Sequence, residues 1–445
     1  MEEISRVAKV VKTIIKEKNV KIFSHYDADG ITSSSIFSKA LLRENVNFQL
    51  RILKQLTKEN IDQIKVNKND FLVFLDLGSG QLNFLKKFFD DTQILIIDHH
   101  YPEKLNHFNL FHLNPLLFGY EDLPASILTY QFVKHLDKKN ADLVDLAIVG
   151  AMADEIEDSL EKKELSKKIF YEAEAIGKLS ISPGLRFYGR NKPIHKSLAF
   201  SFNPFIPGIS GSESQAVQFL SEIGIPIMHE NNFRTLKDLT LEEQQKLATA
   251  LIFEKIKAKE KLEDIFGNVY TLIGKPEEIQ DAKEFGTIIN ACGRTNRIDL
   301  AVRLCLEDYS SLSKCIEVLD DYRKVISDAL ILLKENKDMI LENDKAKFIL
   351  GESKIPDTII GTIISIILNS EIDNQKPIFG FSYTSDGMIK VSARAPTNLK
   401  INLADILKKA SSIINGEAGG HEKAAGALIP KDKQFELINI ISDLL

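Results

Sequence analysis

The chain has 445 residues, about three times the length of a typical domain, which predicts two or three domains. Hydrophobic residues make up 44% and charged residues 27%, which excludes a wholly disordered chain because enough apolar surface is available to offset the entropy of folding. The formal net charge of −6 excludes a globally basic coat for nucleic acid, so such a partner would be bound by a local groove or through metal ions.

The cysteines and the hydropathy pattern favour a reducing, aqueous compartment. Cys292, Cys305 and Cys315 are 13 and 10 residues apart, which fits neither a C-x-x-C metal site nor a disulfide framework. The first 19 residues form an amphipathic, charge-rich helical pattern, and no run reaches the ~18 apolar residues of a membrane span. We therefore expect a cytoplasmic protein with buried cysteines and no membrane partner.

From residue 20 to residue 98, short apolar or β-branched runs alternate with helical patterns. This alternation is typical of a mostly parallel sheet covered by helices, and it predicts an α/β, doubly wound N-terminal domain. The expected strands are 20–24, 46–52, 71–76 and 93–98, and the expected crossover helices lie within 31–44, 61–67 and 82–89.

Helical patterns dominate the middle of the chain. Residues 142–158, 236–263 and most of 310–345 are expected to be helical. Residues 388–396 are expected to form a strand after a tight turn at 385–387, which carries the sequence Ser-Asp-Gly.

Acidic and imidazole side chains follow three of the expected strands. The set consists of His25, Asp27 and Asp29 after the first strand, Asp76 after the third, and Asp98, His99 and His100 after the fourth. Ligands of doubly wound sheets bind beyond the carboxyl ends of the strands, so we expect these residues at one rim. The apolar helical pattern that runs into Asp154 can add one more carboxylate.

Several carboxylates on one rim would repel each other strongly unless cations neutralised them. Oxygen and imidazole ligands suit Mn²⁺, tolerate Mg²⁺, and argue against metals that need thiolates. Two ions bridged by one carboxylate would polarise a phosphoryl group and supply a nucleophile, which predicts phosphoester hydrolysis. Each piece has a simpler alternative, since a lone D-x-D-G is more often a turn or a Ca²⁺-type site and Asp98 could merely cap a helix. The combination at consecutive strand ends favours the metal site.

Four motifs in this region resemble those of the DHH phosphoesterase superfamily. They are HYDADGITS at 25–33, DLGSG at 76–80, DHHYP at 98–102 and GAMAD at 150–154, and HLNP at 112–115 resembles the connector after the third motif. The resemblance implies one metal held by His25, Asp27 and Asp76, and another held by Asp29, Asp76, His99 and Asp154. It also implies that Asp76 bridges the ions, that His100 faces the scissile phosphate, and that Asp98 orients an imidazole. Bacterial RecJ usually has Asp at the position of His25.

Two further segments resemble substrate-binding elements of the same superfamily. GEAGGHEKAAGALIP at 416–430 and MIKVSARAP at 388–396 look like the DHH-associated domain, which implies substrate contacts from Ser392, Arg394, Gly419, Gly420 and His421. IINACGRTNRIDLAVRLCLED at 288–308 resembles an element of RecJ nucleases, which implies that Asn290 and Arg294 line the substrate channel. Each could instead be structural: a glycine-rich turn, or a helix end with a surface arginine.

This resemblance divides the chain into four segments. We expect a DHH catalytic domain at 1–177, an inserted loop-rich and helical segment at 178–285, a channel element with a helical connector at 286–345, and a smaller α/β DHH-associated domain at 346–445 across a cleft. In the insertion, basic and aromatic residues could form an exposed wall that stacks and holds single strands. They are Arg186, Phe187, Tyr188, Arg190, Lys192, His195 and Lys196. The alternative is a long loop packed over the helices at 236–263.

The overall pattern is similar to archaeal RecJ-like proteins, some of which associate with the GINS replication complex. It implies a two-metal exonuclease, with Mn²⁺ preferred and Mg²⁺ possible, that degrades single-stranded DNA or RNA to mononucleotides in replication or repair. Replisome proteins such as GINS and a second copy of the chain are the implied protein partners. Two alternatives stay open: a phosphodiesterase of short oligonucleotides or cyclic dinucleotides, and a replisome scaffold with little catalysis. Polarity and the choice between DNA and RNA are not encoded in the motifs.

Overall fold

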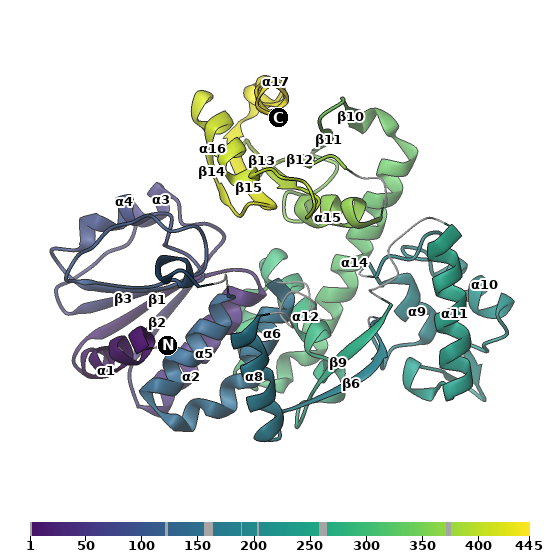
Figure 1. Cartoon of the computed structure of the whole chain (residues 1–445), viewed down its shortest axis with the longest axis horizontal. Coiled ribbons are helices and arrows are strands. Elements are labelled where there is room, and N and C mark those ends of the chain that lie inside the picture. The colour runs from purple at the N-terminus through teal and green to yellow at the C-terminus, as the bar shows by residue number, and fades with distance from the viewer. Residues whose placement is uncertain are drawn as a thin grey trace. The chain divides into compact units, whose positions relative to one another are not determined.

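The computed structural model describes residues 2–120, 123–154, 163–187, 189–202, 204–257, 265–370 and 375–445 (Figure 1). The chain forms two compact units, and each unit contains two separate segments of the sequence. Unit 1 consists of Met1–Ile181 and Tyr270–Asp320, and unit 2 consists of Ser182–Val269 and Asp321–Leu445.

A five-stranded parallel sheet lies at the centre of unit 1, with the strand order β2-β1-β3-β4-β5. The strands are β1 (Asn19–His25), β2 (Phe48–Leu53), β3 (Asp70–Leu75), β4 (Gln93–Ile97) and β5 (Leu110–Leu113). The order confirms the predicted doubly wound sheet. Strand β5 was not among the predicted strands, because four mostly half-buried residues at an edge are too few to show a strand pattern.

Helices cover both faces of this sheet (Figure 1). Alternate residues of a strand point to opposite faces, and Phe74 and Ile96 pack in one cluster with Ile61, Leu82 and Leu85 of the short helices on that side. Those helices are α3 (Lys58–Asp62) and α4 (Leu82–Leu85). The other helices that pack around the sheet and on each other are α1 (Glu2–Glu17), α2 (Ala28–Arg43), α5 (Ala125–Leu136), α6 (Val144–Asp154), α8 (Glu164–Ala175), α12 (Ala282–Arg294) and α13 (Ile298–Cys305).

The helical part of the predicted segment 61–67 is short, because α3 ends at Asp62. Ile64 and Val66 then pack from a non-helical segment onto the same cluster as α3. The three cysteines are buried and free, as expected.

The first part of unit 2 is a small module with its own hydrophobic core. It contains the hairpin of β7 (Met228–His229) and β8 (Asn232–Phe233) and the helices α9 (Ile194–Ala199), α10 (Glu213–Glu222) and α11 (Leu241–Lys257). The paired strands β6 (Leu179–Leu185) and β9 (Phe266–Leu272) connect it to unit 1, because the boundary between the units falls within both strands. Ile206, Leu220 and Leu247 are fully buried in its core. The loop-rich part of the insertion therefore packs against α11 in one core, in agreement with the alternative stated above, and the inserted segment is a folded module.

The burial pattern of this module corrects the idea of an exposed basic and aromatic wall. Phe187 packs in the core and His195 is also buried, so neither can stack on a nucleic acid. The guanidinium of Arg186 lies against Gly267, where a Cβ atom would collide with it. Tyr188 lies outside the described residues.

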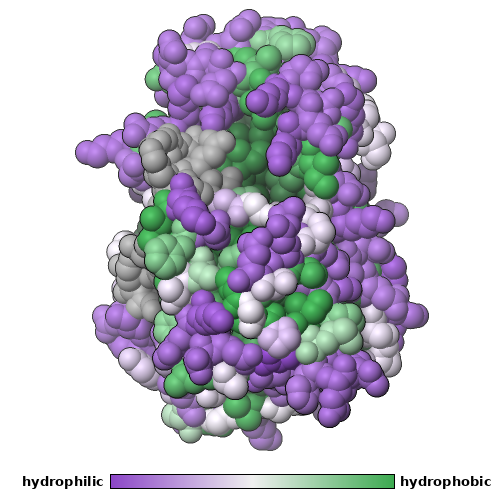
Figure 2. Space-filling model, turned by 90° about the vertical axis from the view of Figure 1, so that its right-hand side faces the viewer, coloured by the Kyte–Doolittle hydropathy of each residue, from purple (hydrophilic) through white to green (hydrophobic). Residues whose placement is uncertain are grey.

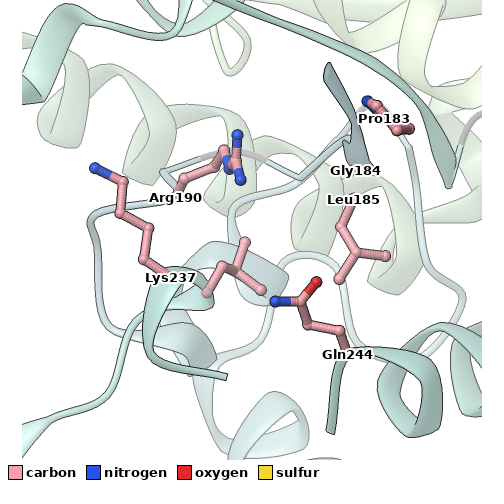
Figure 3. Close-up of a pocket in the computed structure, with 7 residues that line it drawn as sticks. Pro183, Gly184, Leu185, Arg190, Lys237 and Gln244 are labelled. Atoms are coloured by element: carbon pink, nitrogen blue, oxygen red, sulfur yellow. The ribbon is translucent and has the colours of Figure 1, made fainter. Parts of the chain in front are cut away.

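A pocket of about 190 Å³ lies in the same module (Figure 3). Its lining includes Arg190, Lys237 and Gln244, together with the apolar Leu185 and Leu236. This volume is below the roughly 300–1,000 Å³ of typical small-molecule sites. Its described lining contains no carboxylate and no imidazole, so it does not provide the chemistry expected of the catalytic site.

A six-stranded sheet forms the rest of unit 2, with the order β10-β11-β12-β13-β15-β14. Its strands are β10 (Ile340–Glu342), β11 (Lys347–Glu352), β12 (Ile378–Tyr383), β13 (Met388–Arg394), β14 (Glu417–Gly420) and β15 (Ala424–Pro430). The long helix α14 (Leu312–Glu335) precedes β10, and the sheet packs with α15 (Ile360–Ser370), α16 (Leu403–Ile413) and α17 (Gln434–Leu444).

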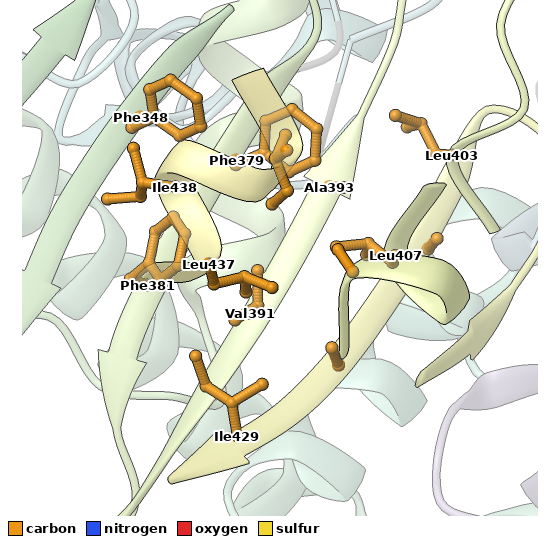
Figure 4. Close-up of a cluster of buried hydrophobic side chains, with 14 of the residues drawn as sticks. Phe348, Phe379, Phe381, Val391, Ala393, Leu403, Leu407, Ile429, Leu437 and Ile438 are labelled. Atoms are coloured by element: carbon orange, nitrogen blue, oxygen red, sulfur yellow. The ribbon is translucent and has the colours of Figure 1, made fainter. Parts of the chain in front are cut away.

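The alternation of side chains along β12 separates two faces of this sheet. Phe379 and Phe381 pack in one core with Leu407 of α16 and Leu437 of α17 (Figure 4). Gly380 points to the opposite face, where a Cβ atom would lie 2.6 Å from Ile360 Cγ1 of α15. The missing side chain therefore lets α15 pack closely on the sheet.

Hydrophilic residues cover most of the face drawn in Figure 2, and hydrophobic residues gather there in smaller patches. Among the helices that the structure describes, none is long and apolar enough to cross a membrane.

Candidate metal centre

The carboxyl ends of three neighbouring strands of unit 1 bring the predicted ligands together. β1, β3 and β4 are adjacent and parallel, so their carboxyl ends lie at one edge of the sheet. His25 is the last residue of β1, Asp76 follows β3 directly, and Asp98 follows β4. The fold thus places the predicted residues at one rim, as parallel topology requires.

Asp27 is held by the start of α2. Its Oδ1 accepts a hydrogen bond from the Gly30 N–H at 3.1 Å, which caps the helix, and its Oδ2 lies 2.8 Å from His25 Nδ1. Burial alone would lower the pKa of His25, but the carboxylates of Asp27 and Asp76 outweigh it and raise that pKa well above its usual value. His25, Asp27 and Asp76 can each offer a ligand atom within 4.8 Å of the others.

Asp29 is oriented by a helix that is distant in the sequence. Helix α5 has no side-chain cap of its own, and its first N–H groups, those of Ala125 and Ser126, donate to the Asp29 carboxylate at 2.6 and 3.0 Å. A helix N-terminus leaves such N–H groups without intrahelical partners and favours negative charge. Even so, burial and the nearby charges of Asp76 and Asp154 raise the pKa of Asp29 well above its usual value.

Asp76 lies between the two groups of ligands. Its backbone has φ +57°, in the left-handed region that non-glycine residues rarely adopt, and its side chain is only 2% exposed. Neither carboxylate oxygen accepts a hydrogen bond from the residues that the structure describes. One oxygen lies 3.3 Å from His25 Nδ1 and the other 3.4 Å from His99 Nε2. This arrangement suits a carboxylate that bridges two cations.

His99 Nε2 faces three carboxylates. It lies 3.4 Å from Asp76 Oδ1, 3.9 Å from Asp29 Oδ2 and 3.8 Å from Asp154 Oδ2. Asp154 ends α6 with its side chain 28% exposed, and partial burial with the charges of Asp76 and Asp27 raises its pKa to about 7. The ligands predicted for the second metal therefore converge.

The reach of Asp154 depends on close packing of two helices. At Gly150 of α6, a Cβ atom would collide with Thr32 Oγ1 of α2 and lie 2.6 Å from Ser126 Oγ. Only glycine allows this approach, and Asp154 lies one helical turn further on. Gly150 thus positions a ligand that it does not itself provide.

Asp98 binds the loop that carries the two histidines. It is fully buried, accepts hydrogen bonds from the N–H groups of Ser79, His99 and His100, and lies 2.7 Å from His100 Nδ1. Burial would raise the pKa of Asp98, but His100 and these hydrogen bonds lower it well below its usual value. Burial likewise opposes the charge of His100, but Asp98 outweighs it and raises the pKa of His100. The pair can hold a proton on His100.

Ser79 and Asn114 connect the loops at the rim, and neither was among the predicted site residues. Asn114 Nδ2 donates to Ser79 Oγ at 2.9 Å and to the His100 carbonyl at 2.8 Å. Ser79 Oγ also lies 2.8 Å from His112 Nε2, and burial lowers the pKa of His112 to about 4, so its ring is neutral at pH 7. In the sequence, their position within the DLGSG and HLNP motifs was the feature that could have identified them as site residues.

The two groups of side chains fit divalent metal ions. They offer carboxylate oxygens and imidazole nitrogens without thiolate, a set suited to Mn²⁺ or Mg²⁺. Buried carboxylates at such short range repel each other, and both oxygens of Asp76 lack hydrogen-bond donors among the described residues. Cations would relieve both costs.

The predicted channel residues Asn290 and Arg294 lie on α12, also in unit 1. Asn290 Oδ1 accepts a hydrogen bond from the Ala28 N–H at 2.8 Å, between Asp27 and Asp29. At Gly293, a Cβ atom would collide with the Tyr26 carbonyl oxygen. Helix α12 therefore supports the loop that carries two ligands, and Arg294 is half-buried at its last turn.

The remaining predicted substrate residues lie together in unit 2. Ser392 of β13 pairs with Gly426 of β15, which in turn pairs with Gly419 of β14. Arg394 Nε donates to Ser365 Oγ of α15 at 3.1 Å. Gly420 has φ +132°, and the His421 N–H donates to the Ala424 carbonyl at 2.7 Å. The register thus joins the Ser-x-Arg strand and the Gly-Gly-His turn in one sheet.

Sequence comparison finds three matching family descriptions and one full-length relative. The chain matches "DHH family, N-terminal domain" over residues 19–153, "DHH-CID domain" over 187–266 and "DHHA1 domain" over 345–445. An uncharacterized protein of Methanocaldococcus jannaschii is 30% identical over 464 aligned positions, which cover 100% of this chain and 98% of the relative.

Solved structures with the same fold include RecJ and CDC45. RecJ of Thermus thermophilus in complex with Mn²⁺ has a TM-score of 0.61 and 16% identity; the match covers 100% of this chain but 55% of that RecJ. An exonuclease RecJ bound to manganese has a TM-score of 0.59 and 16% identity, over 98% of this chain and 93% of that one. CDC45 of Entamoeba histolytica has a TM-score of 0.67 and 11% identity, over 99% of this chain and 98% of that one.

Proposed function

The chain belongs to the DHH phosphoesterase superfamily as a RecJ-like protein, and from that premise we propose that it is a divalent-metal-dependent exonuclease that releases mononucleotides from single-stranded DNA or RNA. The observation that carries the proposal is the buried Asp76, whose two oxygens face two separate groups of ligand side chains. A ligand arrangement of this kind serves phosphoryl chemistry with two cations.

Each side chain of the rim has a proposed role. His25, Asp27 and Asp76 hold one ion, and Asp29, Asp76, His99 and Asp154 hold the other, with Mn²⁺ preferred over Mg²⁺. Bound divalent ions would polarise the phosphoryl group and lower the pKa of a bound water. His100, kept protonated by Asp98, donates a hydrogen bond to a phosphoryl oxygen and stabilises the charge that develops there.

The rest of the proposed machinery holds the strand. Asn290 and Arg294 line the substrate channel, and Asn290 also fixes the loop between Asp27 and Asp29. The substrate residues of unit 2 would bind backbone phosphates; they are Ser392, Arg394, Gly419, Gly420 and His421. An arginine fork and glycine backbone N–H groups suit phosphate oxygens. Replication or repair is the proposed context, and GINS-type proteins or a second copy of the chain are the proposed partners.

The test is a time course on single-stranded DNA and RNA labelled at the 5′ or 3′ end, with Mn²⁺, with Mg²⁺ and with chelator. The variant is Asp76→Asn, which keeps the side-chain shape and removes the charge. The matched control is Asp70→Asn at the other end of β3, because Asp70 is also buried but pairs with Lys21 Nζ at 2.6 Å. We expect mononucleotide release that falls by roughly two orders of magnitude or more in Asp76→Asn and persists in Asp70→Asn. Wild-type turnover by Asp76→Asn would contradict the proposal.

Two other functions are distinguished by the same assay. A series of strands from a dinucleotide to about thirty nucleotides tests a short-oligonucleotide hydrolase, which would prefer the shortest substrates steeply. A replisome scaffold is favoured by one observation, the similarity in fold to CDC45 over nearly the whole of both chains. No cleavage of any strand with either metal would support the scaffold.

A further inference from the structure

Exposed aromatic side chains lie on the two loops that follow β4 and β5. Tyr101 is 79% exposed, Phe118 48% and Tyr120 62%. Single exposed apolar side chains are common on protein surfaces and need no explanation. Here three aromatic residues occur on two connected loops, at the edge of the sheet that carries the metal-binding cluster.

The backbone of both loops is well anchored beside the cluster. Asn114, the first residue after β5, donates to the carbonyl of His100, and His100 is the residue directly before Tyr101. The turn that follows is closed by the Tyr120 N–H, which donates to the Pro115 carbonyl at 3.1 Å, and by Gly119 with φ +70°. The aromatic residues are therefore presented by ordered backbone, which limits the entropy lost when a ligand binds.

The position of Tyr101 indicates what these residues contact. Consecutive Cα atoms are about 3.8 Å apart, so the backbone of Tyr101 is next to that of His100, the proposed phosphate contact. When the phosphate of a nucleotide contacts His100, the base of the same nucleotide lies within about one or two Cα–Cα spacings of His100. Aromatic side chains stack on any of the bases, because every base has a π face.

We propose that Tyr101, Phe118 and Tyr120 form a base-stacking platform for the nucleotides that flank the scissile phosphate. The inference rests on the proposed function and adds to it the groups that select a base-bearing strand. Phosphate contacts position a strand, whereas stacking on the bases distinguishes a nucleotide from other phosphodiesters. The platform accepts any base, so it gives affinity without sequence preference.

Phe108, at the opposite end of β5, offers a matched control. Phe108 is 81% exposed and lies two residues before β5, at the amino edge of the sheet. It has the same side chain as Phe118 and nearly the same exposure as Tyr101, but the length of β5 separates it from the rim. Loss of Phe108 tests the general effect of removing an exposed aromatic residue.

The experiment uses the full chain with Tyr101→Ala, with Phe118→Ala and Tyr120→Ala together, and with all three. The first readout is kcat and KM on a single strand with normal nucleotides and on a strand whose terminal nucleotides are abasic. The second is the fluorescence of 2-aminopurine near the end of a strand with hydrolysis-resistant phosphorothioate linkages. Because the three side chains are exposed, we expect thermal unfolding of the variants to match that of the wild type.

For the triple variant we expect KM on the normal strand to rise on the order of tenfold, with kcat within about twofold of wild type. On the abasic strand we expect the KM of the triple variant to equal that of the wild type. Phe108→Ala should leave kcat and KM on the normal strand as in the wild type. If KM on the normal strand does not change in the triple variant, the platform is refuted.

Failure of the proposed function is distinguishable from failure of the platform. If the wild type hydrolyses no strand, the nuclease proposal fails, and the platform is judged by 2-aminopurine alone. Quenching by the wild type that is lost in the triple variant supports stacking. Equal quenching by both proteins overturns it.

Discussion

Asp76→Asn should have opposite effects on stability in the absence and in the presence of metal. The wild-type carboxylate is 2% exposed, and its oxygens accept no hydrogen bond from the described residues. An ion buried without full compensation costs several kcal/mol, and here His25 Nδ1 at 3.3 Å offsets part of that cost. Removing the charge also ends its repulsion with the carboxylates of Asp29 and Asp154, so it should raise the free energy of unfolding of the metal-free protein by about 1–2 kcal/mol.

That gain corresponds to a rise in Tm of roughly 2–8 °C for a domain of this size. Saturating metal should reverse the order, because a ligand at 100 times its Kd stabilises the wild type by about 2.7 kcal/mol. The variant lacks the shared ligand and should respond to metal much more weakly. The assay is thermal unfolding by calorimetry or circular dichroism, with chelator and across a Mn²⁺ titration.

Asp70→Asn is the control, because its buried carboxylate is fully engaged. Asp70 pairs with Lys21 Nζ at 2.6 Å and accepts the Asn67 N–H at 2.8 Å. Its replacement should lower Tm with and without metal, and it should leave the response to Mn²⁺ intact. If Asp76→Asn lowered the Tm of the metal-free protein and kept the full response to Mn²⁺, the reasoning from unpaired burial would be wrong.

Three further changes test other parts of the structure. Asp98→Asn should move the alkaline limb of the kcat–pH profile to lower pH, because burial alone would lower the pKa of His100 and Asp98 raises it. An alkaline limb at the wild-type position would show that the proton on His100 does not control kcat. Gly150→Ala should destabilise the protein by about 1–3 kcal/mol in urea unfolding and weaken Mn²⁺ binding. Adding Thr32→Ala removes the colliding Oγ1 and should restore part of the stability and part of the Mn²⁺ affinity. If neither recovers, the collision is not the cause. Phe381→Ala should cost about 3–5 kcal/mol in urea unfolding of unit 2, because the ring is fully buried; a cost below about 1 kcal/mol would contradict the described core.

The sequence by itself determined the class of the N-terminal fold and the chemistry of its rim. Alternating apolar runs and helical patterns predicted the doubly wound sheet, because the periods of strands and helices are local properties of the chain. The topology of parallel sheets then placed His25, Asp76 and Asp98 at one edge without further information. The roles of His25 and Asp76 as metal ligands, and of Asp98 as the residue that orients His100, remain predictions of that pattern.

Only the tertiary structure decided how the rim is held. The N–H groups of α5 that orient Asp29 are nearly 100 residues away in sequence, and the approach of α6 depends on a glycine that meets Thr32 of another helix. Neither contact leaves a periodic signal, because it joins segments that are distant along the chain. The same holds for Asn114, whose amide connects the loops after β3 and β4.

Burial in the inserted module was likewise decided by long-range packing. A basic and aromatic sequence is compatible with an exposed binding wall or with a folded core, and its local pattern does not separate the two. The structure buries Phe187 and His195, and Phe187 packs in a core that spans residues 185–265. Which aromatic residues stay exposed, as Tyr101 and Tyr120 do, depends on the surface left free after all segments have packed.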